Sequence, residues 1–326
     1  MDPETGETQT TIFTMSVKTP LISIVVPAYN CAEYAEETFR SVQKQDFQDW
    51  EIIFVNDGST DNTAEVLESF ASEDHRVIVV DQENGRQGKA RNNGISHAQG
   101  KWIAFLDADD LWPENKLSLQ LSKTLEANVD LSFTDGFICL GNNMNLREFR
   151  FGVIDKFYQG NNAVLEFHKQ NRIPTSTVLV KKSALLEVGG FPEKLIVQNC
   201  EDYLLWVKLL TKGKSFLSIG EPLLLYRVHD NSSTSTEVKA MFPLINALLE
   251  LPGGISNERI QHLKNTFTTL VFRLNELGEI NKANSFVIPV LKVIYSGLIK
   301  QILLISWKIS PRFFIRIFWR LNNQKT

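Results

Sequence analysis

Short apolar runs alternate with amphipathic stretches along the first third of the chain. The apolar runs have the length of strands buried on both faces, and they cover 21–30, 50–57, 76–82 and 101–107. Between them, apolar residues recur with helical spacing over 32–45, 60–72 and 88–99. Strands that alternate with helices in this way predict an α/β fold with a Rossmann-like, mostly parallel sheet and helices on both of its faces. Ligands of such sheets bind beyond the C-terminal ends of the strands.

The second half of the chain follows a less regular pattern. Helices are predicted over 113–127, 162–171 and 201–210, and strands over 129–140, over 175–182 and once or twice within 214–230. The stretch 141–160 has no clear period and is expected to form a loop or an irregular hairpin. From about 237 onward the pattern is helical, so a helical C-terminal region follows the α/β part.

Composition places the chain among globular proteins. With 326 residues, 43% of them hydrophobic, it is long enough for one large domain or two smaller ones. The three cysteines lie far apart and form no CxxC pair, which excludes a zinc site built from them and favours buried thiols in a reducing compartment. Residues 1–20 lack the basic start and apolar core of a signal peptide, so we expect a disordered tail on a cytoplasmic protein.

Positive charge is concentrated at the C-terminal end. The chain carries −4 overall, but eight basic and no acidic side chains follow Glu279, which leaves −12 for the rest. An acidic body is not the footprint of a nucleic-acid-binding protein, whereas a basic tail suits an anionic membrane surface. In the tail, Arg312, Arg316 and Arg320 alternate with aromatic residues, which is typical of a helix lying in the membrane interface. The alternative is that these helices pack on the catalytic part or on a second subunit.

Three carboxylates follow the apolar run at 101–107. Asp107, Asp109 and Asp110 would repel one another unless a cation lies between them, and Mg²⁺ or Mn²⁺ prefers carboxylate oxygens. Asp107 and Asp109 are two residues apart, so on a continuing strand both would point the same way and suit a metal–diphosphate site. The alternative is a solvated turn in which Asp110 caps the next helix, and for Asp110 alone we favour that alternative.

Four segments in this order carry a resemblance to a known family. They are VVPAYN (25–30), VNDGSTDNT (55–63), the stretch 83–110 that ends in FLDADD, and GGFPE…CEDYLLWVKL (189–209), with YRVHDNSST (226–234) extending the match. Together they resemble the inverting nucleotide-sugar glycosyltransferases of family 2, which have the A-type glycosyltransferase fold.

The resemblance divides the chain into domains. It covers about two thirds of the sequence and implies a catalytic domain over 21–235, with a nucleotide-binding half (21–110) and an acceptor-binding half (111–235). The tail over 236–326 lies outside the match. We interpret it as a helical, basic and aromatic region that associates with a membrane.

The resemblance implies a nucleoside site at the ends of the first two strands. Asp57 would hold the base, and its carboxylate can accept a hydrogen bond from the N3–H of uracil or thymine but not from unprotonated cytosine N3. Of these bases we favour uracil, and so UDP. The backbone of Pro27 and Ala28 and the side chain of Tyr29 would contact the nucleoside. Glu33 would bond the ribose or cap the following helix. For Asp57 the alternative is a turn residue, and for Tyr29 it is local packing.

The resemblance also implies a metal–diphosphate site. Asp109 matches the second Asp of the family's DxD motif and would bind Mn²⁺ or Mg²⁺, while Asp107 would contact ribose or metal. Arg91 lies in a loop running into a helix and would pair with the diphosphate. His229 would bind the metal or the diphosphate, and Arg227 would neutralise phosphate. For His229 the alternative is a polar group satisfied within the fold.

Asp202 matches the general base of the family. An inverting transfer needs one carboxylate that takes the proton from the acceptor hydroxyl while its oxygen attacks C1, and it needs no carboxylate nucleophile. Glu201 would touch the acceptor or cap the helix. For both residues the alternative is that they merely stabilise the dipole of the helix that begins here.

We therefore expect an inverting glycosyltransferase that moves a sugar from a nucleotide diphosphate, UDP in our interpretation, to a hydroxyl of a growing glycan or lipid-linked acceptor in cell-surface polysaccharide synthesis. The enzyme would lie peripherally on the inner face of the cell membrane. Two alternatives are a nucleotidyltransferase that makes nucleotide-sugars and a non-catalytic sugar-nucleotide sensor. The first should carry basic residues directly after the first strand, where VVPAYNCAEYAEE has none. The second would tolerate loss of Asp202.

Overall fold

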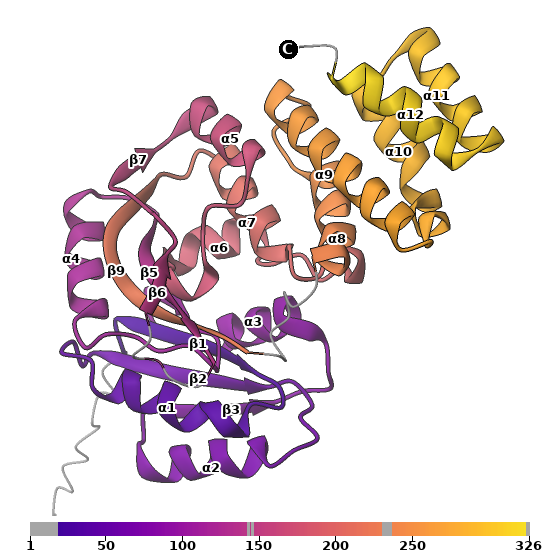
Figure 1. Cartoon of the computed structure of the whole chain (residues 1–326). Helices are drawn as coiled ribbons and strands as arrows, with labels where there is room; N and C mark the ends of the chain where they lie inside the picture. Colours follow the sequence, from indigo (N-terminus) through magenta and orange to yellow (C-terminus); the bar gives the residue numbers. More distant parts are fainter. Residues whose placement is uncertain (1–18, 142–143, 145–146, 230–236, 324–326) are drawn as a thin grey trace, which may run out of the picture.

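A mixed sheet forms the centre of the α/β part (Figure 1). The computed structural model describes residues 19–141, 144, 147–229 and 237–323. Within them the sheet has the strand order β3-β2-β1-β4-β8-β5-β9-β7, with β6 paired to β5. The four parallel strands of the first half are β1 (Ile22–Ala28), β2 (Trp50–Asn56), β3 (Val77–Asp81) and β4 (Trp102–Phe105). The helices between them are α1 (Ala32–Gln43), α2 (Thr63–Glu73) and α3 (Arg86–His97).

The two faces of this parallel half bury different side chains, because successive strand residues point in opposite directions. Ile24, Ile52 and Phe54 face α1 and α2, where the rings of Phe39 and Phe70 stack at 4.5 Å. Val25 and Val55 face α3 on the other side. A Cβ at Gly94 of α3 would lie 2.5 Å from Val25 Cγ1, so only glycine lets α3 approach the sheet this closely. The predicted fold class is confirmed for this half.

The second half adds shorter and partly antiparallel strands. Its strands are β5 (Leu131–Leu140), β6 (Arg147–Arg150), β7 (Lys156–Tyr158), β8 (Leu179–Lys181) and β9 (Phe216–Val228). Its helices and 3₁₀ turns are α4 (Lys116–Glu126), α5 (Gly160–Lys169), η1 (Thr175–Thr177), α6 (Lys182–Val188), η2 (Leu195–Val197) and α7 (Glu201–Thr211). β8 runs antiparallel to β4 and β5, whereas β5 and β9 are parallel.

Two sequence predictions need correction here. The stretch 175–182 was predicted as one strand, but it begins as the 3₁₀ turn η1 and becomes a strand only at 179. The turn follows Pro174, which has no N–H to donate to a neighbouring strand. The run at 101–107 also ends as a strand at Phe105. Asp107 and Asp109 therefore lie on a turn and not on a continuing strand.

The helical C-terminal region is built onto the α/β part. It contains α8 (Glu237–Glu250), α9 (Asn257–Glu276), η3 (Ile280–Ala283), α10 (Asn284–Ile294), α11 (Gly297–Ile309) and α12 (Pro311–Asn323). α9 packs on α5, and α8 packs on η2 and α7. Leu248, Phe267 and Phe314 belong to the same buried core as Trp206 of α7. The predicted boundary at 235 thus separates two regions that share one core.

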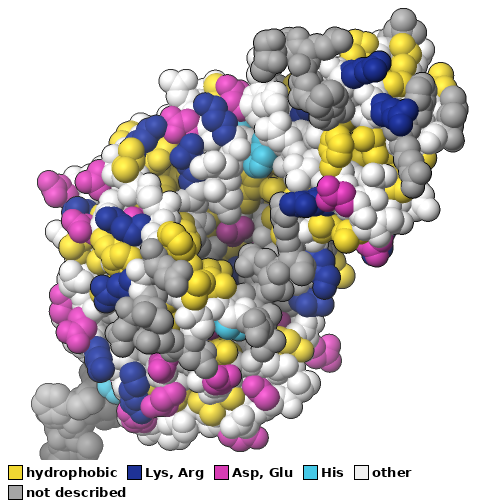
Figure 2. All heavy atoms as spheres, in the orientation of Figure 1, with side chains coloured by type: hydrophobic (Ala, Val, Ile, Leu, Met, Phe, Trp, Pro, Cys, Tyr) yellow, Lys and Arg dark blue, Asp and Glu magenta, His cyan; other side chains and the backbone are white. Residues whose placement is uncertain are grey.

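Hydrophobic and basic side chains lie together on the surface of the last three helices, α10–α12. Figure 2 shows Lys and Arg side chains among hydrophobic ones on the part of the surface formed by α10–α12. On α11 the side chains of Ile299, Ile302 and Ile305 are 44%, 44% and 57% exposed. In the part of the chain that the structure describes, no helix is both long enough and apolar enough to span a membrane.

Candidate active site

Two adjoining cavities open beyond the C-terminal ends of the central strands. The first cavity has a volume of about 630 Å³, and its lining includes Pro27, Ala28, Tyr29, Asp57, Asp109 and His229. The second cavity has a volume of about 470 Å³, and its lining includes Phe133, Tyr158, Arg172, Thr175, Glu201 and Asp202. Four residues line both cavities: Gln87, Asp107, Asn199 and Tyr226. The predicted nucleoside and metal residues thus lie mainly on one side of this shared wall, and the predicted base lies on the other.

Asp57 follows β2 directly and is 4% exposed. Its Oδ1 accepts hydrogen bonds from Gln82 Nε2 and Gly85 N, both at 2.7 Å, and its Oδ2 accepts one from Arg86 N at 2.9 Å. A carboxylate offers about four acceptor positions, so one position on Oδ2 remains for a ligand. Asp57 therefore holds the start of α3 and still faces the first cavity.

The end of β1 forms another wall of the first cavity. Pro27 and Ala28 lie in the last residues of β1, and the ring of Tyr29 just beyond is 49% exposed. Glu33 lies in the first turn of α1 with an exposed side chain. It does not belong to the lining of this cavity as formed by the described residues, so its predicted contact with ribose stays a prediction.

Asp109 and His229 meet across the first cavity. Asp109 Oδ2 lies 3.0 Å from His229 Nε2, and the His229 ring packs on Tyr34. Burial and the charge of Asp107 raise the pKa of Asp109, the contact with His229 counteracts this, and a cation beside the carboxylate would further favour its ionised form. Among the described residues no three His, Cys, Asp or Glu side chains form a metal site. The pair fits a cation that takes its other ligands from a bound diphosphate, as Mg²⁺ commonly does.

Asp110 corrects the sequence prediction of a solvated helix cap. It is fully buried, and its Oδ1 accepts a hydrogen bond of 3.0 Å from the backbone N–H of Arg227 in β9. Burial and the charge of Asp109 raise its pKa well above the usual range. Thr38 donates to the carbonyls of Ala108 and Asp110, and these bonds fix the turn that carries Asp109.

Arg227 is 2% exposed and holds the same turn from the side of β9. Its Nε donates to the carbonyl oxygen of Asp109 at 2.8 Å, and its Nη2 pairs with Glu37. These contacts position Asp109. The predicted contact of Arg227 with phosphate stays a prediction.

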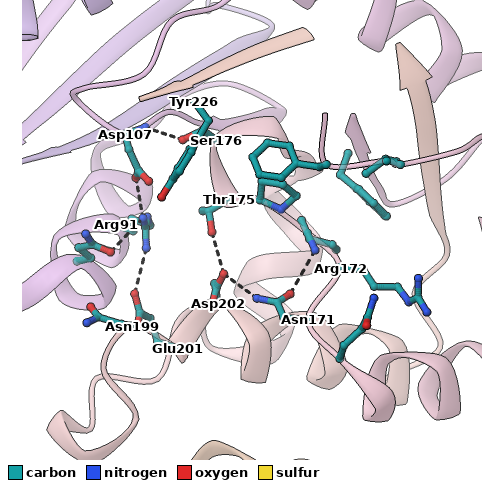
Figure 3. Close-up of a pocket in the computed structure, with 18 of the residues that line it drawn as sticks. Arg91, Asp107, Asn171, Arg172, Thr175, Ser176, Asn199, Glu201, Asp202 and Tyr226 are labelled. Atoms are coloured by element: carbon teal, nitrogen blue, oxygen red, sulfur yellow. Dashed lines mark hydrogen bonds and ion pairs between the residues drawn. The ribbon is translucent and has the colours of Figure 1, made fainter. Parts of the chain in front are cut away.

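Arg91 links the two halves of the site (Figure 3). It is 2% exposed, with Nη2 at 2.7 Å from Asp107 Oδ1 and Nη1 at 3.1 Å from Glu201 Oε1. Burial opposes the charge of Arg91, but the two carboxylates outweigh it, so the net effect is a raised pKa. Arg91 thus neutralises two carboxylates, while its predicted contact with a diphosphate stays a prediction.

Asp202 lies in the first turn of α7 and faces the second cavity. Its Oδ2 accepts hydrogen bonds from Thr175 Oγ1 at 3.0 Å and from Asn171 Nδ2 at 3.2 Å (Figure 3). Its Oδ1 accepts one from Tyr203 N at 2.6 Å. Burial raises the pKa of Asp202 and Arg91 counteracts this. The carboxylate is oriented and less acidic than usual, as a general base requires.

Sequence reasoning missed the residues that hold these carboxylates. Thr175 and Asn171 orient Asp202, and Ser176 accepts a hydrogen bond of 3.1 Å from the N–H of Asp107. The turn η1 therefore touches both the Asp107 turn and Asp202. No spacing in the sequence marks these residues, because their partners lie 27 to 69 positions away.

Comparisons with known proteins give one consistent family. The sequence pattern described as Glycosyl transferase family 2 matches residues 23–187. The chain is 33% identical to the putative teichuronic acid biosynthesis glycosyltransferase TuaG of Bacillus subtilis (strain 168), over 68% of this chain and 84% of that protein. It is 29% identical, over 71% of this chain and 88% of that protein, to WfgD of Escherichia coli, named as UDP-Glc:alpha-D-GlcNAc-diphosphoundecaprenol beta-1,3-glucosyltransferase.

A solved structure has the same fold. The crystal structure of S. aureus TarS 1-349 in complex with UDP-GlcNAc matches with a TM-score of 0.65 at 19% identity. The match covers 94% of this chain and 93% of that one, so it includes the helical C-terminal region.

Proposed function

Since the chain belongs to glycosyltransferase family 2, we propose that it moves a sugar from a UDP-sugar to a hydroxyl group with inversion, in the synthesis of a cell-surface polysaccharide. The observation that carries the proposal is the arrangement of the two cavities. They share Asp107. Among the described residues, Asp202 is the one carboxylate lining the second cavity that forms no direct ion pair. A donor in the first cavity would thus present its sugar toward a base in the second.

The first cavity would hold the nucleotide. The free acceptor position of Asp57 suits the N3–H of uracil, and the exposed ring of Tyr29 and the end of β1 offer a surface for the nucleoside. The TarS crystals, which contain UDP-GlcNAc, are consistent with this donor class.

Asp109 and His229 would hold Mn²⁺ or Mg²⁺ together with the diphosphate. When bound, the cation would stabilise negative charge on the leaving diphosphate. The residues around it keep Asp109 in place, because Arg227 and Thr38 bind the backbone of its turn.

Asp202 would take the proton from the acceptor hydroxyl as that oxygen attacks C1 of the sugar. The carboxylate would keep its direction during the transfer, since Thr175 and Asn171 donate to Oδ2. Glu201 would stay paired with Arg91 and form the floor of the acceptor site.

The acceptor would be a growing glycan or a lipid-linked sugar at the inner face of the cell membrane. The name of WfgD includes a diphosphoundecaprenol acceptor, which supports this acceptor class. The C-terminal helices would bring the site to the membrane surface, because they expose isoleucines on α11 and basic side chains on α12.

Two variants test the proposal by separating donor binding from transfer. Asp109→Ala should abolish Mn²⁺-dependent binding of UDP in calorimetry, since it removes one of two protein ligands. Asp202→Asn should bind UDP and Mn²⁺ as the parent does and lower transfer by about 100-fold or more, because the amide cannot accept the proton. Near-parental turnover of Asp202→Asn would favour the sensor hypothesis, and unchanged metal-dependent binding by Asp109→Ala would exclude the proposed metal site.

A further inference from the structure

The far end of the second cavity carries an arginine whose charge has no acidic partner in the described part of the chain. Arg172 lines this cavity, and Figure 3 shows it on the opposite side of Asp202 from Arg91. Its Nε is buried, and among the described residues that nitrogen has no hydrogen-bond acceptor. A charge that is partly buried without a counterion is unfavourable, so the guanidinium favours an anionic ligand in the cavity that it lines.

Two other cations in or beside this cavity are already neutralised. Arg91 pairs with Asp107 and Glu201. Lys156 lies 2.7 Å from Glu166, just beside the cavity wall formed by Tyr158. Within the residues described, Arg172 is the one basic side chain of the lining without a carboxylate partner.

We propose that Arg172 binds an anionic group of the acceptor while the acceptor's reacting hydroxyl faces Asp202. This inference rests on the proposed function, since it names the acceptor class of the same site. A guanidinium offers parallel N–H donors that match the two oxygens of a phosphate or a carboxylate. The amides of Gln170 and Asn171 line the same stretch and add polar groups beside the anion.

The surroundings of Arg172 favour a phosphate that is attached to a hydrocarbon chain. The wall of the cavity continues through Phe151, Val153 and Ile154, and Ile154 is 70% exposed. Phe157, in the adjacent strand β7, is 52% exposed. An acceptor sugar linked through a diphosphate to a polyprenyl chain would place its sugar near Asp202, its phosphates near Arg172 and the start of its chain along this apolar rim. The carboxylate of a uronic acid in a glycan is the other anionic group that would pair with the guanidinium in the same way.

The experiment compares charged and neutral acceptors with matched variants. The probes are GlcNAc diphosphate carrying a short alkyl chain, a neutral alkyl glycoside of GlcNAc, and an oligosaccharide that ends in a uronic acid. The variants are Arg172→Gln, Arg172→Lys and, as control, Lys169→Gln, which removes an exposed charge at the end of α5. Binding of each probe is measured by calorimetry in the presence of UDP, and transfer is measured where it occurs.

Arg172→Gln should weaken binding of the alkyl diphosphate by about tenfold or more and leave binding of the neutral glycoside and of UDP unchanged. Arg172→Lys should fall between parent and Arg172→Gln, since lysine keeps the charge but loses the paired donors. A loss confined to the uronic acid probe would support the same site with a carboxylate as its ligand. Equal losses for charged and neutral probes, or an unchanged affinity for all, would overturn the proposal.

Failure of the anion site at Arg172 and failure of the proposed sugar transfer give different results. If Arg172→Gln weakens binding of the alkyl diphosphate while no acceptor receives sugar, the anion site stands and the proposed transfer fails. If transfer to the neutral glycoside proceeds and Arg172→Gln has no effect on any acceptor, the transfer stands and the anion site fails.

Discussion

At the scale of single residues, each carboxylate of the site is held by donors that come from another segment. Asp57 accepts two backbone N–H groups at the start of α3, and Asp202 accepts the hydroxyl of Thr175. Such hydrogen bonds fix the orientation of the carboxylate, and they also favour its ionised form. Among these donors, the hydroxyl of Thr175 can be removed with the least change in side-chain volume, because valine has nearly the shape of threonine.

Replacing Thr175 with valine should disturb the base without disturbing the donor site. Removing a hydrogen bond to the carboxylate raises the pKa of Asp202, so a larger fraction of the base is protonated at a given pH. The acid limb of the transfer rate should therefore move to higher pH, and kcat on that limb should fall below the parental value. The measurement is a pH profile of transfer together with UDP binding, which should not change.

Thr211→Val is the matched control for this variant. Thr211 lies at the end of the same helix, α7, with an exposed side chain whose hydroxyl donates to the carbonyl oxygen of Lys208. A pH profile of Thr175→Val that coincides with those of the parent and the control would show that Thr175 does not act through Asp202.

The sequence could identify the carboxylates but not their partners. Asp107, Asp109 and Asp202 stand in short motifs at the end of a strand and the start of a helix, where position alone indicates chemistry. Thr175 and Arg172 carry no such mark, because they reach the site through a loop and a 3₁₀ turn whose path depends on tertiary packing. Asp110 was misjudged for the same reason, since its partner in β9 is 117 residues away.

At the scale of elements, the end of α8 shows how the helical region is fastened. The last carbonyls of a helix have no partner within the helix. Arg259, at the start of α9 and 5% exposed, donates to the carbonyl oxygens of Leu248, Leu249, Leu251 and Gly254 at 2.6 to 2.9 Å. A cation at this end also interacts favourably with the helix dipole.

Arg259→Met should therefore destabilise the protein. The substitution leaves buried carbonyl oxygens without donors, and we expect the free energy of unfolding to fall by about 3 kcal/mol. Urea denaturation followed by circular dichroism measures the loss. Arg320→Met, at an exposed position on α12, should change the same free energy by less than about 0.5 kcal/mol. Similar small changes in both variants would mean that the Arg259 contacts contribute little.

Element prediction from the sequence was best where one periodic pattern ran without interruption. The strands and helices of the parallel half agree with their predicted positions to within a few residues, because apolar runs and helical spacing there are unambiguous. α6 and β8 are short and adjoin each other, so the single run 175–182 concealed a turn, a strand and the start of a helix.

At the scale of the whole molecule, the C-terminal helices cannot be treated as a removable tail. Phe286, Phe314 and Phe318 are buried, and the ring of Phe318 packs edge-on against Phe267 of α9 at 5.8 Å. A deletion from Phe286 onward would expose this apolar face of α9. Loss of membrane binding after such a deletion could then reflect misfolding, so the test of the membrane hypothesis has to use side chains that are already exposed.

The structure supplies two such sets of side chains for testing membrane binding. Ile299, Ile302 and Ile305 are exposed on α11, and Arg316 and Arg320 are exposed on α12.

Arg316→Gln with Arg320→Gln should weaken binding to anionic vesicles by roughly 30-fold, because each basic residue near such a surface contributes about 1 kcal/mol. Serine at the three isoleucine positions should also weaken binding, and the binding that remains should depend entirely on anionic lipid, since only the electrostatic contribution would be left. Vesicle co-sedimentation measures both effects, with UDP binding and the unfolding midpoint as controls that should stay at the parental values. A parent that ignores anionic vesicles would contradict the membrane hypothesis, and charge variants that bind them as the parent does would show that the arginines make no contribution.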